Sequence, residues 1–267
     1  MCEEGGVPVR LLIYPDYETV SNKAANHVCE AINSYGNKSR PFVLGLPAGS
    51  TPLGTYKELI RRYKDRSVSF KNVITINMNE YVDIPEKNPQ SYRSYMYETF
   101  FKHIDILEKN THIPSGNARN LEKESANYEA MITDLGGVDL FMAGVGRDGH
   151  IAFNMAGSSL SSRTHVQKLN KQTIEANSRF FGNDLSRVPT RAITVGMGTI
   201  MDARQVLLVV SGQDKAEAMK HGVEGAITHM WTITALQMHP NAVVMCDESA
   251  ASALNPETLE MFRFLES

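Results

Sequence analysis

The sequence predicts an α/β protein whose sheet is mainly parallel. Short apolar runs alternate along the chain with longer segments that have helical spacing. Strands that alternate with helices form βαβ units, and such units place their strands parallel. No linker, internal repeat or low-complexity tract interrupts the alternation, so we expect a single domain over residues 1–267.

The first half of the chain predicts three strands, each followed by a helix. Three short apolar runs have the length and composition of strands, namely 11–14, 42–46 and 73–78. The segments that follow them carry apolar residues at helical spacing, and in the last segment aromatic residues share one face. We therefore expect helices over 20–35, 55–63 and 91–101.

The second half predicts four more strands and one more helix. The run Val206–Val210 is the clearest strand, because it is short, apolar and rich in β-branched residues. Similar apolar runs predict strands over 138–143, 192–195 and 242–245. Residues 215–223 have helical spacing and are expected to form a helix.

Composition and charge narrow the class of protein. The chain has 267 residues with 42% hydrophobic and 21% charged side chains, and its formal net charge is -3. No basic stretch indicates a nucleic-acid partner, and no uncharged apolar run approaches the roughly 20 residues of a membrane helix. Three cysteines without metal-ligand spacing (Cys2, Cys29 and Cys246) fit a reducing compartment. We expect a cytoplasmic protein.

The stretch Gly144–Asn154 is the strongest functional signal, because it follows the predicted strand 138–143. Its glycines permit a sharp turn close to a ligand. Asp148 and His150 then lie at the carboxyl end of the strand, where ligands bind in open α/β sheets. A carboxylate beside an imidazole suits proton transfer. The plainer alternative is a glycine-rich turn with a satisfied histidine, and the combination of residue types favours a site.

The same stretch also matches the glycine fingerprint of dinucleotide-binding proteins. That fingerprint requires an amphipathic helix directly after the glycines. The chain instead continues through Asn154, Gly157, Ser158 and Ser159, which is typical of a loop. The sequence therefore argues against a nicotinamide-dependent dehydrogenase.

A second loop, after the predicted strand 42–46, has the composition of a phosphate cradle. Gly49, Ser50 and Thr51 precede a helix, so backbone N–H groups and hydroxyls could face an anion. An ordinary helix cap is an equally good interpretation of this loop alone. Arg179 and Lys215 are candidate phosphate partners, although surface solvation explains either one by itself.

The polar residues Asn77–Glu80 at the end of the third strand point to the same edge of the sheet, or to a solvated strand end.

Taken in order, these motifs resemble glucosamine-6-phosphate deaminases from Arg10 to Glu248. The matching pieces are 41–47, 77–82, 146–154, 158–164, 176–181 and 229–233. The resemblance implies a modified Rossmann-like fold, a mainly parallel sheet with helices on both faces. It also implies conversion of glucosamine 6-phosphate and water to fructose 6-phosphate and ammonia, without metal or organic cofactor. A second interpretation is the related family of 6-phosphogluconolactonases. It ranks second because Ile151–Asn154 departs from the motif of that family.

The resemblance also assigns roles to residues. The sugar phosphate would lie on Gly49, Ser50, Thr51, Arg179 and Lys215. His150 would help open the sugar ring, held by Asp148. In the family a glutamate at position 155 supports that histidine, and an aspartate at position 79 moves the proton between C2 and C1.

Two of these catalytic positions depart from the family, since the chain has Asn79 and Met155 there. An amide is not a useful base, and a thioether cannot orient an imidazole. We therefore expect sugar-phosphate binding with lowered turnover, or a sugar-phosphate-binding protein without catalysis. Retained activity would need another carboxylate, and Glu80 is the nearest candidate, although in a continuing strand it faces the opposite side from Asn79.

The resemblance finally bears on assembly and regulation. The family forms homo-oligomers, often hexamers, and we expect a homo-oligomer here. Bacterial members bind an allosteric effector between subunits; the equivalent positions are Ser158, His165 and Gln167, and the last two replace an arginine and a lysine. Residues 1–9 form an N-terminal extension that displaces the terminal amine used at that site. We therefore expect allostery to be lost or altered.

Overall fold

A seven-stranded parallel sheet forms the centre of the protein, as predicted. The computed structural model describes residues 9–36 and 39–266, so residues 1–8 of the N-terminal extension lie outside the described residues. In spatial order the strands are β1 (Arg10–Tyr14), β10 (Ala242–Asp247), β9 (Val206–Val210), β6 (Leu140–Ala143), β2 (Phe42–Leu46), β3 (Val73–Asn77) and β5 (Thr111–His112). Every pairing between them is parallel.

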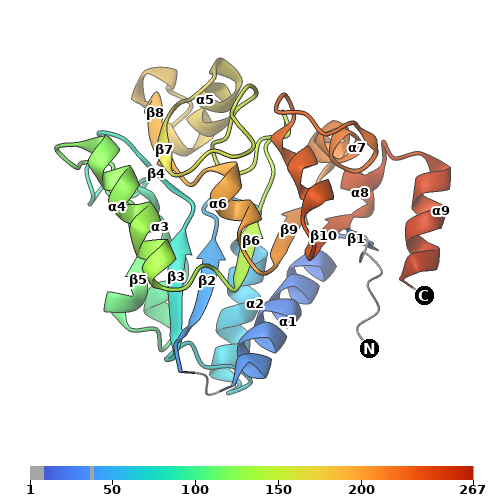
Figure 1. The fold of residues 1–267 in the computed structure, drawn as a ribbon, viewed down its shortest axis with the longest axis horizontal. Coiled ribbons are helices and arrows are strands. Elements are labelled where there is room, and N and C mark those ends of the chain that lie inside the picture. The colour runs from blue at the N-terminus through green and yellow to red at the C-terminus, as the bar shows by residue number, and fades with distance from the viewer. Residues whose placement is uncertain (1–8, 37–38, 267) are drawn as a thin grey trace.

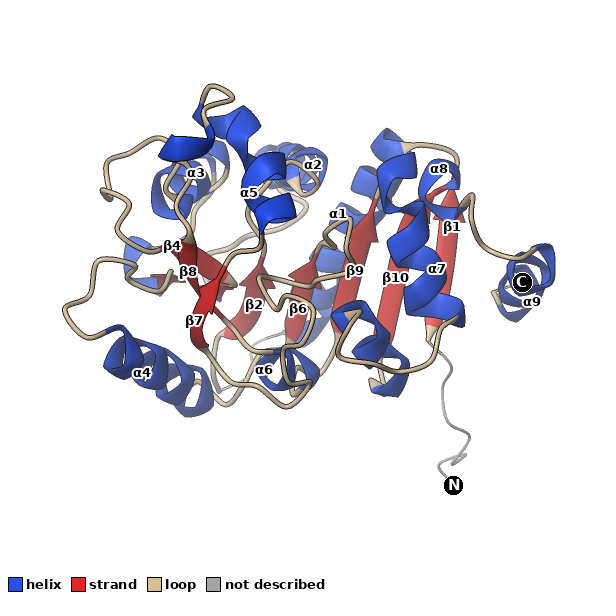
Figure 2. Cartoon of the chain, turned by 90° about the horizontal axis from the view of Figure 1, so that it is seen from above, coloured by secondary structure: helices blue, strands red, loops and turns tan. Residues whose placement is uncertain are grey.

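Helices cover both faces of this sheet. They are α1 (Tyr17–Tyr35), α2 (Leu53–Lys64), α3 (Tyr92–Thr99), α4 (Leu121–Asp134), α5 (Lys171–Asn177), α6 (Met197–Met201), α7 (Ala216–Glu224), α8 (Glu248–Ala251) and α9 (Pro256–Leu265). Figure 2 shows α4 and α6 on one side of the strands and α2 on the other. The two faces therefore confirm the predicted layered architecture.

Each face of the sheet has its own apolar core, because successive strand residues point to opposite sides. Leu207 and Val209 pack with α1 and α2, whereas Val206, Leu208 and Val210 pack with α4, α6 and α7. All five side chains of β9 are buried. Burial on both faces is the reason that the strands are continuous apolar runs without polar alternation.

The predicted strand 73–78 is too long, because the chain changes sheets at Met78. The Met78 N–H donates to Leu46 O of the large sheet at 3.1 Å, and its carbonyl accepts from Val195 N at 2.8 Å. The next residues form β4 (Asn79–Tyr81) in a separate three-stranded antiparallel sheet with β8 (Arg191–Thr194) and β7 (His165–Lys168). The predicted strand 192–195 therefore exists but does not belong to the parallel sheet.

Several elements were not predicted. Three of them are the helices α4, α5 and α9, whose sequences mix polar and apolar residues. The other two are the strands β7, which is only partly buried, and β5, which has two residues. The predicted helix 215–223 starts one residue later, because Gln213–Lys215 is a short 3-10 turn that precedes α7.

The ends of the strands and the small sheet define one side of the molecule. In Figure 1 the arrowheads of β2 and β3 point toward β4, β7, β8 and α5. Loops from the carboxyl ends of the parallel strands thus face the small sheet. Among the described residues, no helix has the length and apolar character needed to cross a membrane.

Candidate active site

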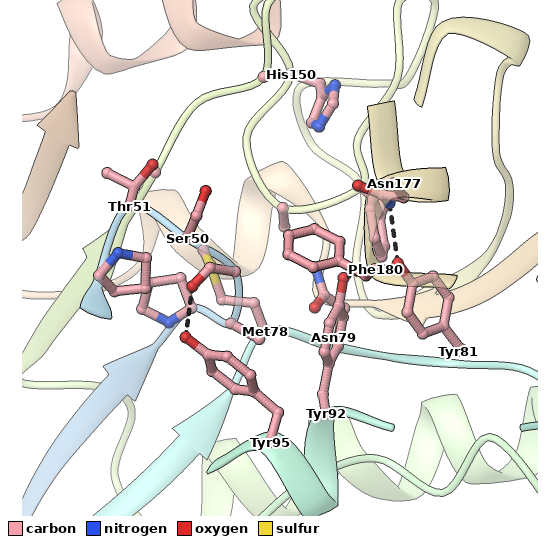
Figure 3. A pocket seen from close by; sticks show the side chains of 18 of the residues that line it. Ser50, Thr51, Met78, Asn79, Tyr81, Tyr92, Tyr95, His150, Asn177 and Phe180 are labelled. Atoms are coloured by element: carbon pink, nitrogen blue, oxygen red, sulfur yellow. Dashed lines mark hydrogen bonds between the residues drawn. The ribbon is translucent and has the colours of Figure 1, made fainter. Parts of the chain in front are cut away.

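A cavity of ≈ 200 Å³ lies at this carboxyl edge. Figure 3 shows its side chains converging from the loop after β2, the start of β4, helix α3, the loop after β6 and the segment around Asn177. Besides the residues treated below, it is lined by Pro47, Ala48, Pro52, Met78, Tyr81, Gln90, Tyr92, Tyr95, Gly144, Val145, Gly146, Ala152, Phe153, Phe180 and Phe181.

One end of the cavity gathers the five residues expected to bind phosphate: Gly49, Ser50, Thr51, Arg179 and Lys215. Arg179 Nη2 donates to Ser50 Oγ at 3.1 Å, although the two residues are 129 positions apart in sequence. The Arg179 guanidinium also lies over the Phe180 ring, 4.7 Å from its centroid. This end is electropositive and is built from three separate segments.

Lys215 is the second cation at this end. Its ammonium lies 3.8 Å from Asp214 Oδ2, and its side chain is only 17% exposed. Burial lowers the pKa of Lys215, while the Asp214 carboxylate opposes that shift. A buried ammonium with one distant carboxylate partner is suited to hold an anion.

His150 and Asp148 form a hydrogen-bonded pair at the other end. His150 Nδ1–H donates to Asp148 Oδ1 at 2.5 Å, and Asn170 Nδ2 donates to Asp148 Oδ2 at 2.9 Å. Burial raises the pKa of Asp148, but the hydrogen bond and charge of His150, assisted by Asn170, outweigh it and hold that pKa far below its usual range. The carboxylate therefore stays ionised and fixes the ring with Nδ1 protonated, which leaves Nε2 for a ligand.

The backbone around His150 explains the glycines of the motif. The Gly146 N–H donates to His150 O at 2.8 Å, and Val145 and Ile151 form an isolated antiparallel bridge. A Cβ at Gly146 would lie 2.2 Å from His150 Cε1, so only glycine fits under the ring. The stretch is thus a closed turn with no helix after Gly149, as expected.

Asn79 lines the cavity from β4 and is 7% exposed. Within the described residues, no hydrogen bond of its side-chain amide is found. The side chain is therefore free to face a ligand, but it is an amide.

Glu80 does not compensate for the missing acid at position 79. It is buried, and its carboxylate accepts from the backbone N–H groups of Tyr81 at 2.8 Å and of Tyr92 and Arg93 at 2.9 Å. It therefore caps the start of α3 and lies outside the cavity lining. Burial raises the pKa of Glu80, which the three N–H groups oppose. The suggested substitute base is thus committed elsewhere, and no Asp or Glu among the described residues lines the cavity.

Met155 lies in an apolar cluster and not on the cavity surface. Its neighbours there include Tyr81, Phe153 and Phe181, and it is 4% exposed. Its sulfur accepts a hydrogen bond from Thr173 Oγ1 at 3.6 Å. Position 155 is therefore packed as a core side chain in this protein.

The three positions equivalent to the family's allosteric site lie away from this cavity. His165 and Gln167 are hydrogen-bonded to each other, with His165 Nε2 3.2 Å from Gln167 Oε1. The Ser158 N–H donates to Met155 O at 2.9 Å. His165 lines a separate hollow beside α4, in which Glu129 accepts hydrogen bonds from Thr164.

Sequence reasoning missed several residues that shape the cavity. Tyr92 and Asn177 both donate to the Tyr81 hydroxyl, at 3.2 and 2.9 Å. The aromatic face of the predicted helix 91–101 was the signal for Tyr92 and Tyr95. No local signal pointed to Asn170, which reaches Asp148 from the start of α5. No group of three or more metal-ligating side chains occurs in the described part of the chain.

Comparisons with known proteins agree with this geometry. Residues 15–249 match the family described as glucosamine-6-phosphate isomerases/6-phosphogluconolactonase. The glucosamine-6-phosphate deaminase of Phocaeicola vulgatus is 52% identical over 259 residues, 97% of this chain and 98% of its own length. That of Parabacteroides distasonis is 53% identical, over 97% and 96% of the two chains.

Solved structures give the same result at the level of the fold. The structure of a monomeric glucosamine-6-phosphate deaminase superposes with a TM-score of 0.88 at 40% identity, covering 92% of this chain and all of its own. The 6-phosphogluconolactonase of Trypanosoma brucei has a TM-score of 0.74 at 17% identity, over 94% of this chain and 100% of its own, and shares the fold alone. The chain belongs to the family of glucosamine-6-phosphate isomerases and 6-phosphogluconolactonases.

Proposed function

We propose that this protein is a glucosamine-6-phosphate deaminase that converts glucosamine 6-phosphate and water to fructose 6-phosphate and ammonia. The observation that carries the proposal is one cavity lined by Arg179, Lys215 and His150, with the His150 ring held by Asp148. Relatives at about half identity over nearly the full length are named for this activity.

The proposed binding mode follows from charge. A phosphoryl dianion is attracted to the end formed by Gly49–Thr51, Arg179 and Lys215. The sugar ring then extends toward His150. His150 Nε2 is available to exchange a proton with the ring oxygen, which opens the pyranose to its aldehyde form.

The next step of the reaction needs a general base, which this site lacks at position 79. Isomerisation removes the proton from C2 and delivers it to C1, after which water replaces the amine at C2 and ammonia leaves. The resemblance gives the C2 proton to a carboxylate at position 79, and Asn79 has no comparable basicity. Loss of a positioned general base typically lowers a rate by ~10²–10⁴-fold. We therefore propose slow turnover.

A second candidate is a sugar-phosphate-binding protein without turnover. The observation that favours it is the lining of the cavity, which contains no carboxylate among the described residues. Binding needs only the cations and N–H donors at the phosphate end, and these do not depend on Asn79 or Met155.

Two measurements on the full chain separate these functions. An ammonia-release assay with glucosamine 6-phosphate reports turnover, and calorimetry with fructose 6-phosphate reports binding. Binding with slow ammonia release supports the deaminase, and binding without detectable release supports the second candidate. If the chain binds NAD and neither sugar phosphate, both proposals are wrong.

The family resemblance also supports a homo-oligomer in the cytoplasm as part of this proposal, whereas one solved relative is described as monomeric. Light scattering on the purified chain measures the oligomeric state. A monomer at the concentrations used for the assays would refute that part of the proposal.

A further inference from the structure

Three tyrosines from three different helices bind the carbonyl groups of the loop between β2 and α2. Tyr56 of α2 donates to Pro47 O at 2.5 Å, and Tyr95 of α3 donates to Gly49 O at 2.5 Å. Tyr17 of α1 lies 3.0 Å from Thr51 O and 3.3 Å from Ser50 O. Figure 3 shows the Tyr95 hydroxyl directed at the loop beside Ser50 and Thr51.

The bonds to Pro47 O, Gly49 O and Ser50 O fix the direction of the N–H group that follows each of these carbonyls. Thr51 O is followed by Pro52, which has no N–H, so the bond to Thr51 O only ties the loop to α1. In a trans peptide the C=O and the next N–H point in opposite directions, and no cis peptide occurs in the described chain. A carbonyl held by Tyr95 therefore turns the Ser50 N–H away from α3. The bonds to Pro47 O and Ser50 O do the same for the N–H groups of Ala48 and Thr51.

The N–H groups of this loop have no partner within the protein. Among the hydrogen bonds of the described residues, none uses the backbone N–H of Gly49, Ser50 or Thr51. All three residues line the cavity, and Ser50 is also the residue that Arg179 contacts. Unpaired backbone donors beside the Arg179 guanidinium are suited to an anion with several acceptor oxygens.

Glycine at two positions makes this arrangement possible. Gly49 has φ of 113°, a conformation that side chains other than glycine rarely adopt. Gly54 allows α1 to approach α2 closely, since a Cβ there would lie 2.9 Å from the Tyr17 hydroxyl. The Gly54 N–H donates to that hydroxyl at 2.8 Å, so Tyr17 is oriented as both acceptor and donor.

We propose that the hydroxyls of Tyr17, Tyr56 and Tyr95 are positioning groups that hold the loop N–H donors toward the phosphoryl group of the ligand. This inference rests on the phosphate site of the proposed function. Donors held in place before binding lose little entropy when the ligand arrives, so each hydroxyl contributes to affinity through the loop that it holds.

The test removes single hydroxyls and keeps the rings. Tyr17→Phe is the main variant, because Tyr17 is 37% exposed and its ring tolerates the change. Tyr95→Phe is the second variant. Tyr97→Phe is the matched control, because Tyr97 lies on the same helix, is 55% exposed and makes no hydrogen bond among the described residues. Calorimetry measures Kd for fructose 6-phosphate and inorganic phosphate, and competition measures it for unphosphorylated fructose.

Each of the first two variants is expected to raise Kd for both phosphorylated ligands about three- to tenfold, the size of one ordinary hydrogen bond. Binding of unphosphorylated fructose is expected to stay unchanged in every variant. The thermal midpoint of Tyr97→Phe is also expected to stay unchanged. Melting curves in the ligand-free state confirm that each variant is folded.

Distinct results overturn the two proposals. If the parent chain binds phosphorylated ligands and both variants keep its Kd within about twofold, the tyrosines only stabilise the fold. An equal loss for fructose, or an equal loss in Tyr97→Phe, also refutes the positioning role. If the parent binds neither phosphorylated ligand, the phosphate site itself is wrong, and this inference falls with it.

Discussion

The two ends of the cavity differ in how completely they match the chemistry that the family resemblance implies. The phosphate end has every expected residue, and Arg179 and Ser50 are in contact. The histidine end keeps the His150–Asp148 pair but has an amide at position 79 and a buried thioether at position 155. Under the proposed function, affinity depends on the first end and turnover on the second, so we expect the two properties to change separately.

The two ends also differ in how they are supported. The phosphate loop is tied by hydroxyls to α1, α2 and α3, which pack on the large sheet. Asp148 is held by Asn170, the first residue before α5, which lies near the small sheet.

The largest expected effect is a gain in the rate of ammonia release from a substitution at the histidine end. Asn79→Asp should raise the rate of ammonia release by about 10²–10⁴-fold, because it restores a base that faces the ligand. Asn177→Asp is the matched control, since it adds the same charge to another position of the cavity lining. A parent chain that is already as fast as Asn79→Asp would contradict the role given to position 79.

Met155→Glu tests the second departure and should give a smaller gain at a cost in stability. The new carboxyl would lie in the apolar cluster around Tyr81 and Phe181, where an unpaired charge is unfavourable. We expect a lower thermal midpoint and a rate gain that appears mainly in combination with Asn79→Asp. Met155→Leu serves as the control for packing. A strong rate gain from Met155→Glu alone would show that position 79 is not the limiting one.

The next effect concerns the phosphate end of the cavity, which has every expected residue. Lys215→Ala or Arg179→Ala should raise Kd for fructose 6-phosphate about 10- to 100-fold, since each charge-assisted hydrogen bond contributes about 1.5–3 kcal/mol. Binding of unphosphorylated fructose should change little. Arg187→Ala is the matched control, because Arg187 is exposed and lies outside the cavity lining. Equal losses for phosphorylated and unphosphorylated sugars would mean that these cations hold structure.

A moderate effect is expected from Asn170, the link between α5 and the histidine end. Asn170→Ser keeps a hydrogen-bonding cap for the Thr173 N–H but is too short to reach Asp148. Loss of the Asn170 donor leaves Asp148 held by His150 alone, so the His150–Asp148 pair is less firmly oriented toward the cavity. The maximal rate should fall about three- to tenfold. A maximal rate equal to that of the chain with Asn170 would show that Asn170 does not support the His150–Asp148 pair.

A smaller effect is the pH dependence of binding. Because burial lowers the pKa of Lys215 below its usual 10.5, the ammonium loses its charge at a lower pH than an exposed lysine does as the pH rises. Affinity for fructose 6-phosphate should therefore fall several-fold in the alkaline range, and binding there should take up a proton. Lys215→Arg should abolish both effects. Calorimetry in buffers of different ionisation enthalpy measures the proton uptake, and none at alkaline pH would refute the assignment.

The smallest expected effect is that of an allosteric ligand. N-acetylglucosamine 6-phosphate should shift the saturation curve of Asn79→Asp by less than about twofold, because His165 and Gln167 replace two cations whose charge-assisted bonds each contribute about 1.5–3 kcal/mol. The double variant His165→Arg, Gln167→Lys is the matched comparison. A large shift in the chain that keeps His165 and Gln167 would show that another phosphate site has formed.

Much of this protein could be predicted from local sequence. The runs 42–46, 206–210 and 242–245 form strands because buried parallel strands need continuous apolar residues. The loops Gly49–Thr51 and Gly146–His150 lie at the carboxyl edge of the sheet because they follow the neighbouring parallel strands β2 and β6. Residues that are adjacent in sequence to a strand end inherit its position, so the phosphate loop and the histidine could be found without coordinates.

Tertiary structure alone decided how those pieces meet. The chain leaves the parallel sheet at Met78 because its N–H and its carbonyl find partners in two different sheets, and this places Asn79 in the cavity and turns Glu80 to cap α3. Asn170, Tyr17 and Tyr95 reach partners that lie 22, 34 and 46 positions away in sequence. Sequence periodicity reports which residues are buried, whereas a hydrogen bond between remote segments depends on how the helices pack against the sheet.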